Sequence, residues 1–313
     1  MNGLSVDPGD RSPCVPFCAL LEIALQPCGW LAAYMGSALK SQADLRFRNL
    51  GGQAEIRQHL TPGDYTLTTR ARLTQASMAG EMIIEQFDFN VSRNDDVVYE
   101  GSTNFGFFTL RALAAQIGIR ETASWAEEPM SHEYAMPAPV EFKNCAAETP
   151  ADPIISAGTG MELPATALRM IDRIDAYDPI GGPEGLGAIR GSKPVDPNAW
   201  FFQAHFFQDP VCPGSLGLES MIQLIQYMAL DRWDSLKETH GFSLMTDQRH
   251  QWTYRGQITP ENSSMEVRMI VTKVREAPYP EMHADGFLYV DGRCIYRMEN
   301  FGVRLIPFLN GNK

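Results

Sequence analysis

The sequence lacks the patterns that mark several large classes of protein. It has no C-x-x-C pair and no G-x-G-x-x-G between an expected strand and helix, which disfavours a metal site and a dinucleotide-binding loop. The N-terminal segment MNGLSVDPGDRSP has no basic-then-apolar layout, so it does not resemble a signal peptide. The six cysteines are scattered: Cys14, Cys18, Cys28, Cys145, Cys212 and Cys294. Free thiols in a reducing cytoplasm are the simplest interpretation.

Positive charge is also scarce. The 313 residues include 26 Lys and Arg against 38 Asp and Glu, a net charge of −12. Nucleic acids and anionic membranes attract basic surfaces, so neither is expected as a main partner. The apolar stretch 16–39 is interrupted by Glu22, Gln26 and Pro27. Because a charge in mid-span is costly in lipid, we predict a buried core helix there and no membrane span.

What the sequence does contain is an internal repeat. The matching segments are 20–36 with 217–233, 60–74 with 258–272, and 97–110 with 294–306. In the first match, Glu22 and Gln26 align with Glu219 and Gln223 at one offset, since 219−22 and 223−26 both equal 197. Matches in the same order at a nearly constant offset indicate a duplicated unit.

Each copy is expected to form one long helix followed by an antiparallel sheet. Alternating β-branched and aromatic residues predict strands at 53–60, 65–76, 80–93 and 96–109, and again at 250–258, 263–275, 283–291 and 293–305. A buried helix on such a sheet is an α+β layout. A Pro- and Ala-rich stretch is expected to be a linker. The predicted division is 1–123, a linker at 124–160, and 161–313.

The most informative segment is AHFFQDPVCPGSLGLESMIQLIQ, residues 204–226. His205 lies in an aromatic run, a Pro- and Gly-containing turn follows, and an apolar helix then carries Glu219. A base, a turn with free backbone N–H groups and a carboxylate on a buried helix are together typical of a proton-transfer site. Histidine suits the base because its ordinary pKa is near neutral.

Three segments carry a resemblance to a known family. LPATALRMIDRI, NAWFFQAHFFQDPVCPGSLGLESMIQL and YRGQITP resemble the bacterial β-hydroxydecanoyl-acyl-carrier-protein dehydratase/isomerase over most of 163–306. The first half, from PFCALLEIALQPCGWLA through FRNLGG to NFGFF, resembles the partner unit in the dehydratase region of polyunsaturated fatty acid synthases. The resemblance implies a double hot-dog fold, in which two tandem units each wrap a long helix in an antiparallel sheet. It also implies a lyase that dehydrates 3-hydroxyacyl-acyl-carrier-protein thioesters to 2-enoyl thioesters in polyunsaturated fatty acid synthesis.

The resemblance also implies roles for individual residues. His205 matches the family's base, Glu219 its helix acid, and the N–H of Gly214 its contact to the substrate carbonyl. Glycine lets the carbonyl approach, and the helix dipole favours developing negative charge. The family's acid is usually Asp, so a glutamate is a mild departure. Because the family's site spans two units, we expect His205 to pair with Glu22, while pairing with Glu219 stays open.

A second working site is not expected. The first copy has Pro8 where His205 maps (205−197) and Phe17 where Gly214 maps (214−197). Proline has no basic group, and Phe17 hinders the approach of a carbonyl. The copy around Glu219 is therefore predicted to be a degenerate pseudo-site.

Further residues are expected on the substrate side of the site. They are Phe206, Pro213, Gln26 and Gln223. Each glutamine lies one helical turn after a glutamate and either orients the acid or a water, or makes structural hydrogen bonds. No cofactor and no metal are expected. The implied partners are an acyl carrier protein, through its phosphopantetheine arm, and the other domains of a synthase. Basic docking candidates are Arg46 with Arg48, or Arg249 with Arg255.

Several alternatives stay open at this stage. The same base can return a proton to another carbon, so isomerisation of the trans-2 product to a cis-3 alkene is not separated from dehydration. A hot-dog thioesterase and a non-catalytic acyl-binding module are the competing functions. The tandem units supply an internal pseudo-dimer, and a further homodimer through exposed sheet edges stays open.

Overall fold

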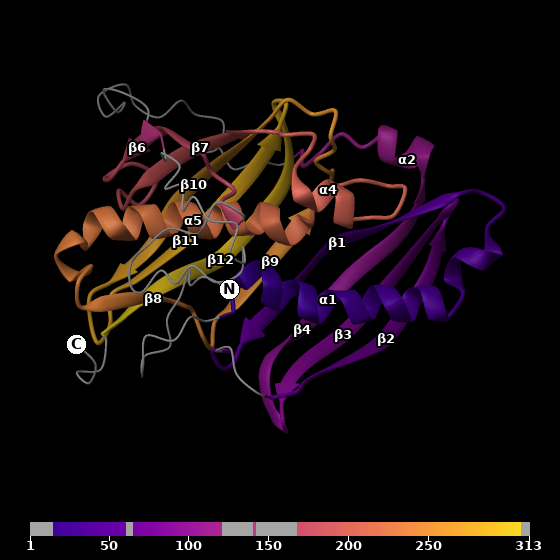
Figure 1. The fold of residues 1–313 in the computed structure, drawn as a ribbon, viewed down its shortest axis with the longest axis horizontal. Helices are drawn as coiled ribbons and strands as arrows, with labels where there is room; N and C mark the ends of the chain where they lie inside the picture. The colour runs from indigo at the N-terminus through magenta and orange to yellow at the C-terminus, as the bar shows by residue number, and fades with distance from the viewer. Residues whose placement is uncertain (1–14, 61–64, 121–139, 142–167, 308–313) are drawn as a thin grey trace.

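The structure, a computed structural model, describes residues 15–60, 65–120, 140–141 and 168–307. Figure 1 shows one long helix and a group of strands for each copy of the repeat. The first copy comprises α1 (Phe17–Tyr34), η1 (Ser37–Lys40), β1 (Leu45–Ile56), β2 (Leu67–Ala79), β3 (Met82–Arg93), β4 (Asp96–Thr109) and α2 (Leu110–Ala114). The rest comprises β5 (Val140–Glu141), β6 (Arg173–Asp178), β7 (Ala188–Pro194), α4 (Trp200–Ala204), α5 (Gly214–Arg232), η4 (Asp234–Leu236), β8 (His240–Leu244), β9 (Arg249–Tyr254), β10 (Ser264–Arg275), β11 (Glu281–Val290) and β12 (Arg293–Pro307).

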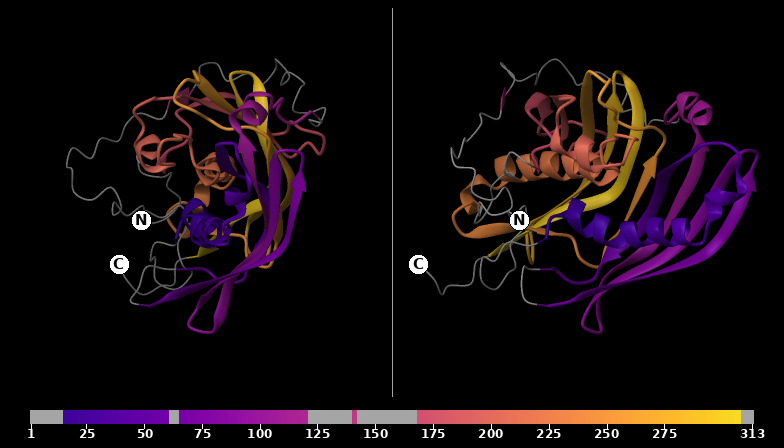
Figure 2. Two further views of the ribbon diagram at one scale, coloured as in Figure 1. Left: turned by 90° about the vertical axis from the view of Figure 1, so that its right-hand side faces the viewer. Right: turned by 45° about the vertical axis from the view of Figure 1, so that its right-hand side comes forward.

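The strands of both copies form one continuous sheet. Its order is β2-β3-β4-β1-β9-β12-β11-β10-β7-β6-β5, and β8 pairs with β12 beside this path. All of these pairings are antiparallel. The sheet curves around α1 and α5, which lie on one side of it (Figure 2). The predicted α+β double hot-dog is confirmed, with the two sheets joined edge to edge.

The two copies are joined by strands β1 and β9. Gly51 pairs with Thr253 and Gly52 with Trp252, and the pairing runs on to Glu55 with Arg249. Gly51 has φ +136°, and a Cβ there would lie 2.4 Å from the carbonyl oxygen of Trp252. The FRNLGG motif therefore needs glycine because the second copy's backbone approaches it so closely.

The strand boundaries differ in two places from those expected. β1 begins at Leu45 rather than at residue 53, because the Gly51-Gly52 pair, which suggests a turn, lies inside the strand and pairs on both sides. By the same offset of 197, Leu45 corresponds to residue 242 of the second copy. The region that begins there is split into two strands, β8 and β9. The expected linker 124–160 lies outside the described residues apart from β5.

The two long helices form the core against the sheet. α1 packs on β2, β3 and β4, α5 packs on β10, β11 and β12, and the helices contact each other. The N-terminal ends of α1 and α5 lie side by side at the centre of the molecule, and the two helices run in opposite directions (Figure 1). The segment Phe17–Leu39 is long and apolar enough to cross a membrane by length and composition alone. In this fold the buried face of its helix, which includes Leu21, Ala24 and Cys28, belongs to the core.

We predict that Gly51→Ala destabilises the protein by roughly 2–4 kcal/mol, through steric overlap with the Trp252 carbonyl and a backbone that L-residues rarely adopt. Gly80 is the matched control: its φ is +62°, and a Cβ there meets nothing within 4 Å. Gly80→Ala should cost only about 1 kcal/mol. Urea unfolding of the two variants measures the difference, and equal losses would contradict the close approach at the joint.

Candidate active site

His205 follows directly after the short helix α4, at its C-terminal cap. Its Nδ1 lies 2.9 Å from the carbonyl oxygen of Val211. A carbonyl oxygen can only accept, so Nδ1 carries the proton of the neutral ring and Nε2 keeps its lone pair. The loop closes on itself through Val211 N to His205 O at 2.8 Å and Asp209 N to Phe206 O at 3.2 Å. The local backbone thus sets the tautomer that a general base needs.

An arginine of the first copy holds this loop in place. Arg48 on β1 donates from Nη1 and Nη2 to the two carboxylate oxygens of Asp209, at 2.6 and 2.8 Å. Its Nε donates to Gln257 Oε1 at 2.6 Å. Arg48 is only 9% exposed, and a two-pronged pair of this kind fixes orientation as well as distance. Arg48 as a docking residue for an acidic partner is therefore a wrong expectation, because its charge is already used inside the protein.

Glu22 reaches the same place from helix α1. Its Oε1 accepts a hydrogen bond from Ser215 Oγ at 2.6 Å, and Ser215 is the second residue of α5. Glu22 and His205 both line a cavity of about 500 Å³, together with Gly214 at the start of α5. The backbone N–H groups in the first turn of a helix have no acceptor within the helix. The structure therefore brings together the expected base, the expected acid of the other copy and the expected N–H donor.

The rest of this cavity is largely apolar. Its wall includes side chains of the first copy's helix and sheet: Leu25, Gly29, Ala33, Phe47, Phe105 and Phe107. Phe47 stacks on Phe105, with ring centroids 4.7 Å apart. Gln26 and Phe206, both expected on the substrate side, also line it. Along α1 the one charged lining residue, Glu22, comes first, and after Gln26 only Gly29, Trp30 and Ala33 line the cavity, a layout that suits a ligand with a polar head and an apolar chain.

Glu219 takes a different position, outside this cavity. It is fully buried, and its Oε2 accepts from the backbone N–H of Cys18 in the first turn of α1 at 3.0 Å. Burial raises the pKa of Glu219 to about 7, and the hydrogen bond from Cys18 partly opposes that shift. Its Oε1 has no hydrogen-bond partner among the residues that the structure describes. The structure thus brings His205 together with Glu22 and not with Glu219.

Two other expected substrate residues also lie away from the cavity lining. Gln223 donates from Nε2 to Leu168 O and accepts from Met170 N, both at 2.8 Å. Its amide therefore makes structural hydrogen bonds to the segment before β6. Pro213 is the N-terminal cap of α5 and does not line the cavity. Of the two roles left open for Gln223, the structure favours the structural one.

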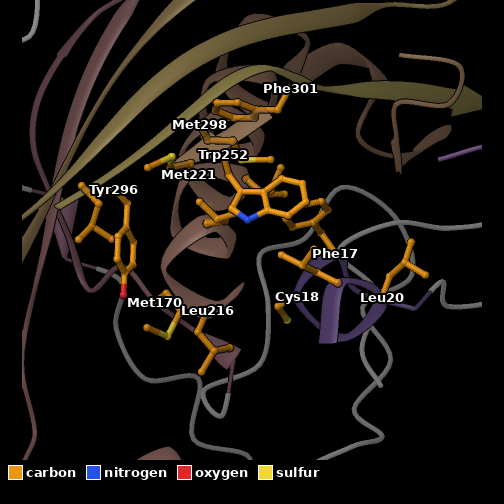
Figure 3. Close-up of a cluster of buried hydrophobic side chains, with 14 of the residues drawn as sticks. Phe17, Cys18, Leu20, Met170, Leu216, Met221, Trp252, Tyr296, Met298 and Phe301 are labelled. Carbon is orange, nitrogen blue, oxygen red and sulfur yellow. The ribbon is translucent and has the colours of Figure 1, made fainter. Parts of the chain in front are cut away.

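The region of the second copy that mirrors the open cavity is almost filled. Only about 20 Å³ remains there, lined by residues that include Phe17, Ile222, Leu244 and Phe301. The last three correspond to Leu25, Phe47 and Phe105 of the open cavity, at offsets of 197, 197 and 196. Figure 3 shows Phe17 and Cys18, at the start of α1, among the apolar side chains of this core. Pro8, which maps to His205, lies outside the described residues.

A buried histidine borders the filled cavity. His250 Nε2 lies 3.0 Å from the hydroxyl of Tyr99, and the imidazole stacks on the tyrosine ring. Burial lowers the pKa of His250 to about 4, so the ring is neutral near pH 7. Phe17 meets it edge-on, at 5.3 Å between ring centroids. The imidazole is therefore a packed, satisfied core group.

Sequence reasoning missed the two residues that link the copies at this site. Arg48 lies in the FRNLGG motif, and its partner Asp209 in the turn after His205. Ser215 follows the expected N–H donor Gly214. Its counterpart at the same helix position is Cys18, since 215−18 equals 197. In the sequence, the one sign of a special role for Ser215 is that the aligned position of the first copy carries a cysteine. Among the described residues, no group of three or more His, Cys, Asp or Glu could hold a metal ion.

Comparisons with known proteins show which proteins this chain is similar to. Residues 163–299 match the model of the FabA-like domain. Over 303 residues the chain is 34% identical to a polyunsaturated fatty acid synthase polypeptide of Thraustochytrium sp., a match that covers 93% of this chain and 20% of the relative. The chain thus spans about one fifth of the length of this curated relative.

One solved structure shares the fold, and another is similar over most of its length. The tesB protein MAP1729c of Mycobacterium avium subs paratuberculosis has a TM-score of 0.51 at 9% identity, covering 94% of this chain and 88% of that one. The dehydratase domain from the CurJ module of the curacin polyketide synthase has a TM-score of 0.45 at 13% identity, covering 95% and 84%. The fold is a double hot-dog, and the match to the FabA-like domain covers residues 163–299, which contain the motif around His205.

Replacing Glu219 by Gln should flatten the dependence of stability on pH. The carboxyl of an unfolded chain titrates at about pH 4.3, whereas burial raises the pKa of Glu219 in the folded protein to about 7. Between these values the folded state binds more protons. This contribution to stability is therefore fully present below about pH 4.3 and lost as pH rises through about 7, roughly 4 kcal/mol in total. Urea unfolding at about pH 5 and about pH 8 measures it, and the same pH slope in both proteins would contradict the raised pKa.

Proposed function

We propose that the chain dehydrates 3-hydroxyacyl thioesters carried on an acyl carrier protein to 2-enoyl thioesters, within a polyunsaturated fatty acid synthase. One observation carries the proposal: His205 and Glu22, from different copies, line a single cavity with the start of α5, and the mirrored cavity is filled. The FabA-like domain and the synthase relative support the same reaction class.

The proposed reaction needs two proton transfers on one face of the substrate. His205 Nε2 removes a proton from the α-carbon, and negative charge develops on the thioester oxygen. The Gly214 N–H and the positive end of α5 stabilise that charge. Glu22 gives its proton to the β-hydroxyl, the C–O bond breaks, and water leaves as the double bond forms. A proton then passes from the imidazolium back to the carboxylate through water, which restores both groups.

This chemistry requires no cofactor, because the base, the acid and the N–H donor all belong to the chain. We place the acyl chain along the apolar wall formed by Leu25, Gly29 and Phe47.

The carrier protein and the neighbouring domains of a larger synthase are the proposed partners, in the cytoplasm. A local basic cluster would serve docking, and Arg249 is exposed whereas Arg48 is buried. Isomerisation to a cis-3 alkene would use the same base.

The assay that tests the function follows one 3-hydroxyacyl thioester to two products. Enoyl thioester supports the dehydratase, whereas free thiol identifies a thioesterase and the absence of both products a binding module. Gas chromatography of the released acids separates a trans-2 from a cis-3 product and so reports isomerisation.

The residue assignment predicts a pattern among three variants. His205→Gln and Glu22→Gln should each lower kcat by about 10²- to 10⁴-fold, the usual contribution of a general acid or base. Glu219→Gln should keep a kcat, calculated per folded molecule, close to that of the unmodified protein. The reason is that the Glu219 side chain caps α1 outside the cavity. An active Glu22→Gln beside an inactive Glu219→Gln would reverse the assignment.

A further inference from the structure

Each long helix begins against a glutamate of the other long helix, but the two contacts differ. At the start of α1, Glu219 Oε2 accepts directly from the backbone N–H of Cys18 at 3.0 Å. At the start of α5, Glu22 Oε1 accepts from the side-chain hydroxyl of Ser215 at 2.6 Å. Cys18 and Ser215 are each the second residue of their helix. The two helix N-termini therefore bind the glutamate of the opposite helix differently, one through the backbone and the other through a side-chain hydroxyl.

A glutamate that faces a helix N-terminus is expected to bond to the backbone. The first-turn N–H groups have no acceptor within the helix, and the positive end of the helix dipole attracts a carboxylate. Glu219 shows this arrangement. A carboxylate bonded there occupies the N–H group and offsets the positive potential that a substrate oxyanion would use. The default contact is thus incompatible with catalysis at that helix end.

In the open cavity a hydroxyl intervenes. A serine O–H is a strong donor and a thiol a weak one: the Cys18 thiol also contacts Glu219, yet the backbone N–H still takes a carboxylate oxygen there. Among the described residues, neither the N–H of Gly214 nor that of Ser215 has an acceptor. The carboxylate is fixed beside the cavity while these N–H groups remain free.

We infer that Ser215 is a positioning residue that keeps Glu22 off the N-terminus of α5. It lets one small site hold both an acid and an unoccupied oxyanion donor. The inference rests on the proposed function, since the free N–H group matters only if a substrate carbonyl binds there. The filled half of the molecule, with cysteine at the equivalent position, shows the arrangement that results when no hydroxyl is present.

The test is Ser215→Ala, which removes the hydroxyl and leaves the helix intact. Glu22 should then bond to the backbone of α5 as Glu219 bonds to that of α1. We expect kcat to fall about tenfold or more, with a smaller effect on KM, because an oxyanion donor acts mainly in the transition state. We also expect Tm to rise by roughly 2–4 °C, the shift of one added helix cap. A residue with a merely structural role would lower both quantities.

Three further variants isolate the cause. Ser215→Thr retains a hydroxyl and should restore kcat and Tm toward their original values. Ser215→Ala combined with Glu22→Gln should lose most of the rise in Tm, because a neutral amide caps a helix less well than a carboxylate. Cys18→Ala is the control at the mirrored position. It should leave kcat unchanged, since Cys18 does not line the open cavity.

The outcomes separate this inference from the proposed function. A Ser215→Ala protein with full kcat, or with a lowered Tm that does not depend on Glu22, would overturn the inference while dehydration by the unmodified protein stands. If the unmodified protein forms no enoyl product, the proposed function fails. The Tm comparison with and without Glu22 then still decides whether Ser215 keeps the carboxylate off the helix: a Glu22-dependent rise supports it and no rise overturns it.

Discussion

The central constraint in this molecule is that two helix N-termini are buried against each other. α1 and α5 run in opposite directions, and the first turn of each lies beside the other helix (Figure 1). Buried backbone N–H groups need acceptors, and leaving one without a partner costs on the order of 1–3 kcal/mol. At the start of α1 the acceptor is Glu219 of the opposite copy, which accepts from a backbone N–H, whereas at the start of α5 Glu22 of the opposite copy accepts from the Ser215 hydroxyl. The copies are therefore tied together through the same groups that form the site. The continuous sheet, joined at β1 and β9, holds both helices in the register that these contacts require.

A duplicated chain can let its two equivalent sites diverge, and here they have. Gly214 lines the open cavity at the start of α5, with the Tyr254 ring packed directly against it, whereas Phe17 takes the matching position in α1 and lines the filled one. The open side keeps about 500 Å³ and the other about 20 Å³. Filling a cavity recovers dispersion contacts and removes apolar surface from water, so the closed half contributes stability that an open half cannot. The first copy nevertheless remains necessary to the site, because it supplies Glu22, the apolar wall and Arg48.

Much of this could be predicted from the sequence, because the repeat offset is a strong constraint. It located both helices, aligned Glu22 with Glu219, and identified Phe17 as the residue that replaces glycine. The family motifs then indicated a site between copies. The remaining features depend on contacts between segments far apart in the chain. Arg48 and Asp209 are separated by 161 residues, and nothing in either local pattern indicates that they meet. The division of a β1-like segment into β8 and β9 likewise follows from packing around β12 rather than from alternation.

Glu219 illustrates how a residue can persist in a fold without taking part in a reaction. Burial penalises its charge, which is why its pKa lies near 7 rather than near its ordinary value. Removing Glu219 would leave the Cys18 N–H without its present acceptor. The free-energy cost of burying the carboxyl is thus offset by the cost of an unpaired N–H that it avoids. A carboxyl accepts this hydrogen bond whether or not it is ionised, and the contact therefore survives titration. In the open half the same geometry would place the acid on the very N–H groups that a substrate oxyanion needs. In the proposed arrangement, the side chain beside each glutamate, a thiol in one copy and a hydroxyl in the other, adds to the loss of the base and of the cavity in separating a structural glutamate from a catalytic one.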